Sequence, residues 1–138
     1  MMAVAQPVHG GGGDNPIDPA NGGDPFIAEE NGEYYYTYTT GGGITIRHIA
    51  SFCDTTTIES KTVYSAGKDG ITGHIWAPEI HRINGKWYII ASALFDKNIV
   101  EGGAMPREPD SSGVDRYRFG FVLESAGDEL FGDRKSVV

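Results

Sequence analysis

The chain has 138 residues, and 11 Lys and Arg stand against 19 Asp and Glu, so its formal net charge is −8. This length suits one ordinary domain, and a hydrophobic content of 39% is enough for a packed core. The acidic balance argues against binding to nucleic acid or to an anionic membrane surface, because both need a clustered basic face. It is compatible with neutral ligands.

The sequence carries few signals of targeting, disulfides or metals. No stretch approaches the roughly 20 apolar residues of a membrane span. Residues 1–6 lack the charged and apolar regions of a signal peptide, although Ala3-Val4-Ala5 resembles the small-residue end of one. Cys53 is the single cysteine, and no group of His, Asp and Glu has the spacing of metal ligands. We therefore predict no metal and no cofactor.

The elements in chain order begin with a Gly-rich lead-in at residues 1–14, which we expect to be flexible. Strands are predicted where β-branched and aromatic residues alternate or cluster, at residues 33–40, 44–51, 86–93 and 117–123. No segment shows a sustained apolar stripe with the 3.6-residue period of a helix. The chain is therefore predicted to be all-β.

An internal repeat is the most informative feature of the sequence. Residues 24–35 align with residues 77–88 without a gap, at a constant offset of 53 positions. The alignment matches Pro25 with Pro78, Ile27 with Ile80, Asn31-Gly32 with Asn84-Gly85, and Tyr35 with Tyr88. Each copy predicts a short strand, a hairpin and a longer strand, because Asn-Gly tolerates the positive φ values of a tight two-residue turn.

The strand that follows repeats less regularly. Ile49-Ala50-Ser51 aligns with Leu123-Glu124-Ser125 at an offset of 74 positions, which is 21 more than 53. Residues 96–116 are polar and rich in Gly and Pro, and they account for the difference. We predict that they form a surface loop inserted between two strands of the second copy.

A unit of fifty-odd residues with about four short strands is typical of a β-propeller blade. The predicted blades span about 15–70 and about 71–138. A β-sandwich also uses short strands at regular spacing and is the alternative, but the aligned Pro and Asn-Gly positions favour blades. Propellers close with roughly four to eight blades, so two blades form an incomplete ring with an open edge. Self-association through that edge is one way to cover it.

Five motifs follow one another along the chain: Asn15-Pro16-Ile17, Gly23-Asp24-Pro25-Phe26-Ile27, Gly32-Glu33-Tyr34-Tyr35-Tyr36, Ile75-Trp76-Ala77-Pro78-Glu79-Ile80-His81 and Gly85-Lys86-Trp87-Tyr88-Ile89. Together with the strand at residues 116–125, they resemble glycoside hydrolase family 43, and within it the arabinan-directed α-L-arabinofuranosidases. The resemblance covers roughly Asn15 to Arg134. Gly-Asp-Pro alone is a weak signal, but the motifs in this order are a strong one.

The resemblance implies a five-bladed β-propeller that hydrolyses the glycosidic bonds of plant cell-wall pentosans with inversion. Its partner would be an oligosaccharide or polysaccharide of the arabinan or arabinoxylan type, and its location would be extracellular. Inverting hydrolysis needs a carboxylate base that activates water and a carboxylic acid that protonates the leaving oxygen, set roughly 6.5–9.5 Å apart. The family adds a third carboxylate that modulates the pKa of the acid.

The resemblance assigns the general base to Asp24, in the first-blade Asp-Pro motif. Pro25 restricts the backbone just before a strand, so Asp24 is expected to project towards the channel where blade edges meet. An aspartate ahead of proline is also a common turn residue, which is the alternative interpretation. The corresponding position of the second repeat is Ala77, and a carboxylate needed only for a turn would have less reason to differ there.

Other residues are candidates for binding sugar. The ring of Trp76 could pack against the C–H bonds of a sugar, or it could belong to the core. His74 could line the same cleft, or it could be an ordinary hydrogen-bonding histidine. Tyr34, Tyr36 and Tyr38 alternate on one strand face, which favours core packing over a ladder for stacking sugars. The family does not use Glu79 as its acid.

In the family, the modulating aspartate and the general-acid glutamate lie in later blades, beyond residue 138. A base alone cannot protonate the departing alkoxide, and losing such a group costs on the order of 10²–10⁴ in rate. We therefore expect an N-terminal portion of a family 43 enzyme that is inactive as a 138-residue chain. The alternative is a non-catalytic partial propeller that binds carbohydrate or self-assembles.

Overall fold

The computed structural model of the protein describes residues 22–50, 58–103, 116–130 and 134–137. The predicted lead-in at residues 1–14, Cys53 and residues 104–115 of the predicted loop lie outside these ranges. No helix in the described parts of the chain is long and apolar enough to cross a membrane.

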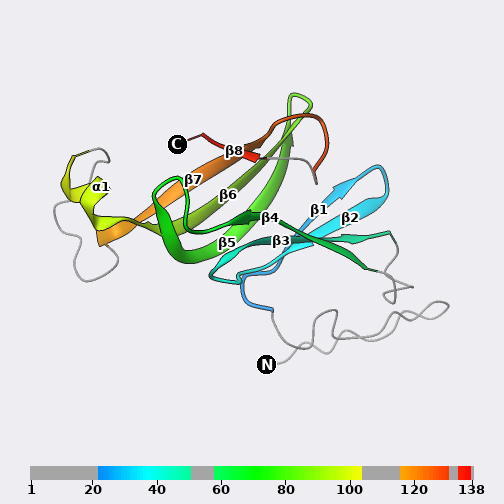
Figure 1. The fold of residues 1–138 in the computed structure, drawn as a ribbon. Helices are drawn as coiled ribbons and strands as arrows, with labels where there is room; N and C mark the ends of the chain where they lie inside the picture. The colour runs from blue at the N-terminus through cyan, green and yellow to red at the C-terminus, as the bar shows by residue number, and fades with distance from the viewer. Residues whose placement is uncertain (1–21, 51–57, 104–115, 131–133, 138) are drawn as a thin grey trace.

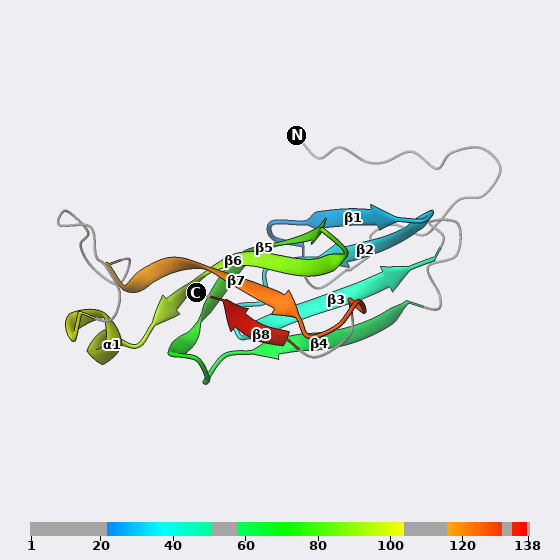
Figure 2. The same cartoon turned by 90° about the horizontal axis from the view of Figure 1, so that it is seen from above.

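The described chain forms two four-stranded antiparallel sheets and one short helix (Figure 1). The first sheet has the order β1 (Phe26–Glu30), β2 (Glu33–Thr37), β3 (Gly43–Ile49) and β4 (Glu59–Ser65). The second has the order β5 (Ile71–Ile83), β6 (Lys86–Phe95), β7 (Arg118–Ser125) and β8 (Arg134–Val137). In both sheets, strands that are consecutive in sequence are hydrogen-bonded neighbours, as in a propeller blade (Figure 2). The all-β prediction is confirmed.

The repeat predicted from sequence is present in the backbone. Phe26 pairs with Thr37 in the first hairpin, and the residues 53 positions later, Glu79 and Ile90, pair in the second. The turn residues have matching φ values, which are 54° and 81° at Asn31-Gly32 and 50° and 81° at Asn84-Gly85. Positive φ at both central residues is the signature of a type I′ turn, which fits the twist of the strands it joins. The Asn-Gly hairpin prediction is therefore confirmed.

The alignment predicted for the third strand is wrong by two residues. Tyr35 and Tyr88 are equivalent in the repeat, and they pair with His48 and Glu124 respectively. The structural offset is therefore 76 positions (48 to 124), where the sequence suggests 74. A shift of two keeps every side chain on the same face of a strand, so the hydrophobic pattern could not reveal the error.

The predicted loop at residues 96–116 contains a short helix, α1 (Lys97–Glu101), which the sequence analysis does not predict. Asp96 caps it, since its side chain accepts a hydrogen bond from the Asn98 amide at 2.7 Å. Val100 is the buried residue of the helix and joins the core. The helix lies beyond the end of β6, at the far side of the second sheet from the two Asn-Gly hairpins (Figure 1).

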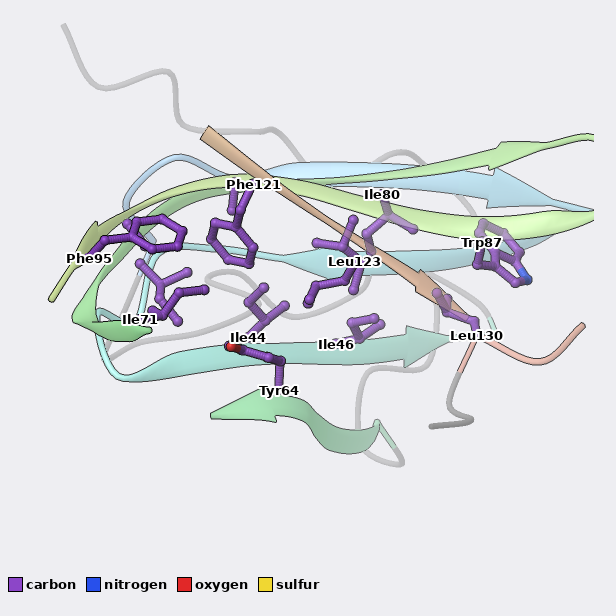
Figure 3. Packing of buried hydrophobic residues seen from close by; sticks show 14 of the residues in the cluster. Ile44, Ile46, Tyr64, Ile71, Ile80, Trp87, Phe95, Phe121, Leu123 and Leu130 are labelled. Atoms are coloured by element: carbon purple, nitrogen blue, oxygen red, sulfur yellow. The ribbon is translucent and has the colours of Figure 1, made fainter. Parts of the chain in front are cut away.

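The main hydrophobic core lies between the two sheets (Figure 3). The first sheet contributes Ile44, Ile46 and Tyr64, and these side chains face residues of the second sheet that include Ile71, Ile80, Trp87, Phe95, Phe121 and Leu123. All nine are at most 4% exposed. Burying an aliphatic or aromatic side chain contributes about 1.5–3 kcal/mol, so this interface holds the two sheets in a fixed relation. The long strand β5 contacts three strands of the first sheet, β1, β2 and β3.

The tyrosines of β2 and the residues after it follow the predicted alternation. Tyr36 and Tyr38 are 6% and 5% exposed, and their rings stack with centroids 5.4 Å apart. Tyr34 packs against the same small cluster, while Tyr35 points to the other side and meets Trp87 at 5.7 Å. The preference for core packing over a sugar-stacking ladder is confirmed.

Candidate functional site

Asp24 is followed by Pro25 and then by Phe26, the first residue of β1. The side chain of Asp24 is exposed. Its φ of 52° is in the left-handed region, which Asp tolerates better than most residues. Thr39, in the segment after β2, donates a hydrogen bond from Oγ1 to Asp24 Oδ2 at 2.7 Å. The Thr39 amide also donates to the Gly23 carbonyl at 2.9 Å. Asp24 is thus fixed by a residue 15 positions away and not by a local turn.

The second sheet reaches the same point. The backbone amide of Ala77, in the middle of β5, donates to Thr39 Oγ1 at 2.8 Å. A hollow of about 120 Å³ lies between the two strands. It is lined by Asp24, Pro25, Phe26, Ala77, Pro78 and Glu79, which are three residues from one repeat and their three counterparts from the other.

Ala77 adopts the backbone conformation of its counterpart. Its φ is 49°, against 52° for Asp24. A left-handed conformation costs a residue other than Gly about 1–3 kcal/mol and persists where the surroundings enforce it. Because alanine takes this conformation in the second repeat, the turn itself does not require a carboxylate. The left-handed turn therefore does not explain why this position carries a carboxylate.

Trp76 and His74 lie next to this hollow in sequence but outside its lining. Trp76 is 42% exposed, and its ring contacts that of His74 edge-on with centroids 6.0 Å apart. The guanidinium of Arg118 lies over the Trp76 ring at 3.7 Å and donates from Nη1 to the His74 carbonyl at 3.1 Å. One face of the indole is therefore covered by a cation, which favours a fixed ring orientation.

The backbone around Trp76 is irregular. The pairing of β5 with β6 shifts register between Ile71 and Gly73, between Gly73 and Trp76, and between Trp76 and Glu79. His74 has a φ of 50° and Gly73 one of 151°. Such bulges re-aim side chains and are frequent next to active sites.

Glu79 lines the hollow with Asp24, but its carboxylate is engaged by a neighbour. Glu79 Oε2 lies 3.1 Å from His81 Nε2. Both side chains are largely exposed, so this contact contributes little to stability. Within the described residues, no group of three or more His, Cys, Asp or Glu is arranged to hold a metal ion.

Sequence reasoning missed two members of the site, Thr39 and Arg118. The hydrogen-bond partners of Thr39 lie 15 and 38 positions away in the sequence, in segments that no motif connects. Its counterpart in the repeat is Ser92, another hydroxyl, and this match was the only signal available. Arg118 begins β7 and reaches Trp76 through the sheet pairing. Its contact also depends on the irregular course of β5 around Trp76, which the sequence pattern did not predict.

A larger hollow among the described residues lies elsewhere. It has a volume of about 380 Å³ and includes Glu30 and Asn31 at the first hairpin, with Arg82 and Trp87 from the second. Because Asp24 lies at the opposite end of β1 from that hairpin, the two hollows are separate. None of the residues predicted to act on substrate lines the larger one.

Residues 13–125 match the model of the glycosyl hydrolases family 43, and the chain belongs to that family. It is 38% identical over 74 residues to an extracellular exo-alpha-(1->5)-L-arabinofuranosidase from Streptomyces avermitilis, covering 51% of this chain and 15% of that protein. It is 37% identical over 71 residues to alpha-L-arabinofuranosidase B from Pyricularia oryzae, covering 48% and 14%. The chain thus spans about a seventh of the length of these relatives.

Solved structures share the fold over nearly the whole chain. The alpha-L-arabinofuranosidase from Lactobacillus brevis superposes with a TM-score of 0.66 at 24% identity, covering 90% of this chain and 37% of that one. An endo-arabinase from Bacteroides thetaiotaomicron gives 0.60 at 20% identity, covering 89% and 37%. The two sheets are therefore blades of the five-bladed propeller type and do not close a ring, as predicted. The β-sandwich alternative is wrong.

Proposed function

We propose that this chain supplies the first catalytic carboxylate of a glycoside hydrolase that cleaves arabinan-type polysaccharides. More specifically, we propose that this hydrolase is an α-L-arabinofuranosidase. Membership of family 43 supports hydrolysis of glycosidic bonds. The names of the curated relatives, all α-L-arabinofuranosidases, support arabinose as the sugar released. Two of these relatives are named extracellular, which supports a location outside the cell.

In this proposal Asp24 is the general base. The observation that carries it is the comparison with Ala77, since the same backbone conformation forms there without a carboxylate. Asp24 is exposed at the rim of a hollow between two blades, and Thr39 holds one of its oxygens. Among the described residues, the other oxygen has no hydrogen-bond partner and so is available to accept a proton from water. A single displacement by that water inverts the anomeric carbon.

Trp76 and His74 have a binding role in the same proposal. The exposed part of the indole can pack against the apolar C–H face of a pentose, while Arg118 holds the ring in place. The general acid and the modulating carboxylate would come from later blades of the ring. The 138-residue chain alone would then bind sugar without hydrolysing it.

The stereochemistry of hydrolysis tests this function. The protein, as its source organism produces it, is mixed with an α-1,5-linked arabino-oligosaccharide, and the anomeric protons of the released sugar are followed by NMR before mutarotation. We expect arabinose whose first-formed anomer has the inverted configuration. Release of the retained anomer, or no release from any arabinan- or xylan-type substrate, would contradict the proposal.

A further inference from the structure

Thr39 bonds to both blades at the candidate site through one hydroxyl group. Its Oγ1 accepts a hydrogen bond from the Ala77 amide at 2.8 Å and lies 2.7 Å from Asp24 Oδ2. A hydroxyl has one proton to donate. Because a backbone amide can only donate, Thr39 is left to direct its own proton at Asp24. The arrangement therefore suits an ionised carboxylate, which is the form that a general base requires.

The backbone conformation of β5 points the Ala77 amide towards Thr39. Ala77 keeps a left-handed φ of 49° at a position where β5 departs from regular pairing with β6. Antiparallel contacts between Gly41 and Ile75 hold this part of β5 against the first sheet, with N–O distances of 2.9 and 3.3 Å. The amide of Ala77 is thus presented to Thr39 by the interface between the blades and not by the sheet to which it belongs.

We infer that Thr39 is a positioning residue, which sets the orientation of Asp24 and couples it to the packing of the second blade on the first. The inference rests on the proposed role of Asp24. Thr39 acts through the carboxylate that it holds and not by contact with substrate. Directing the Thr39 proton to Oδ2 leaves the lone pairs of Oδ1 for water. Misplacing a catalytic group by about 1 Å costs on the order of a hundred-fold in rate.

The test compares three variants in the protein as its source produces it. Thr39→Val keeps the β-branched shape but removes the hydroxyl, and Thr39→Ser restores it. Thr40→Val is the matched control, because the Thr40 hydroxyl also donates one hydrogen bond, to the Gly43 carbonyl at 2.6 Å, but within the first blade. The values of kcat and KM on an arabino-oligosaccharide and the melting temperature are measured for each.

We expect Thr39→Val to lower kcat about ten- to a hundred-fold with KM unchanged, and Thr39→Ser and Thr40→Val to stay near the unsubstituted protein. An unchanged kcat in Thr39→Val would overturn the inference. So would a loss that Thr39→Ser does not restore, or a loss that Thr40→Val shares together with a lower melting temperature. Asp24→Ala is measured alongside. If it keeps full activity, the proposed role of Asp24 as the base fails together with that of Thr39, whereas a fall in Asp24→Ala alone rejects only the role of Thr39.

Discussion

Tyr64 is a buried residue whose hydroxyl group is held by two acceptors. The side chain is 3% exposed and packs against Phe121 across the interface between the sheets. Its hydroxyl lies 3.1 Å from Asp69 Oδ2 and 3.3 Å from the Lys68 carbonyl. Burial, and then the hydrogen bond to Asp69, raise the pKa of Tyr64 well above its usual value of 10.0.

This raised pKa makes folding stability depend on alkaline pH. Above pH 10 the unfolded chain releases the Tyr64 proton while the folded chain keeps it. The contribution of Tyr64 to stability is therefore complete below pH 10 and declines as the pH rises further. Tyr64→Phe should cost about 1 kcal/mol at pH 7 and should flatten the decline between pH 10 and 11. The pKa values of Tyr35 and Tyr88 are also raised, but both tyrosines are present in the unsubstituted protein and in Tyr64→Phe. Their contributions therefore cancel when the two stability curves are compared. Urea unfolding across pH 7–11 measures this; parallel stability curves would refute it.

Short motifs identify some residues of the candidate site and miss others. Asp24 and Trp76 were singled out because each belongs to a short contiguous motif. Thr39 was not, because its partners are 15 and 38 positions away and its role exists only once two blades are packed. The left-handed conformation of Ala77 was equally hidden, since alanine rarely adopts it and only the surrounding structure enforces it.

At its first residue, Gly43, strand β3 lies very close to the backbone of β4. A side chain at Gly43 would place its Cβ 2.6 Å from the carbonyl oxygen of Tyr64, which is a backbone atom and cannot rotate away. The pairing of β3 with β4 shifts register one residue later, between Ile44 and Thr45. A glycine here therefore serves the packing of two strands.

Substitution of this glycine should loosen the first sheet. Gly43→Ala is expected to lower the free energy of unfolding by about 1–3 kcal/mol, because the two strands must move apart. Gly42→Ala is the matched control, since a Cβ there meets no atom within 4 Å. Thermal or urea unfolding of both variants is the measurement. Equal stability of the two would show that β3 and β4 adjust without cost.

Elements with strong local signals were predicted well, and those without were not. The Asn-Gly hairpins were found because the turn type demands those residues. The third-strand alignment was off by two because period-2 alternation is blind to a shift of two. The helix α1 is only five residues long, too short for a helical period to appear, and its one sequence signal was the capping Asp96.

The chain is about a third as long as the solved propellers that it resembles. The side of the second sheet turned away from the first carries an exposed apolar residue. Ile90 is 41% exposed, whereas its neighbours Ile89 and Ala91 are buried against the first sheet. In a ring, the next blade covers such a face. Self-association of the 138-residue chain through this face stays a prediction.

The proposed role of the Asp24 carboxylate is to activate water. The kinetics of Asp24→Ala, in the protein as its source produces it, test this role. Alanine suits the position, because Ala77 already holds the same backbone conformation in the second repeat. Glu29→Ala is the control: it removes a carboxylate from the same strand, one that accepts a hydrogen bond from the Gly32 amide at the far hairpin.

We predict that Asp24→Ala lowers kcat on an arabino-oligosaccharide by about 10²–10⁴ while the affinity for the sugar is retained. Glu29→Ala should keep a kcat close to that of the unsubstituted protein. If the two variants hydrolyse the substrate at the same rate, Asp24 is not the base.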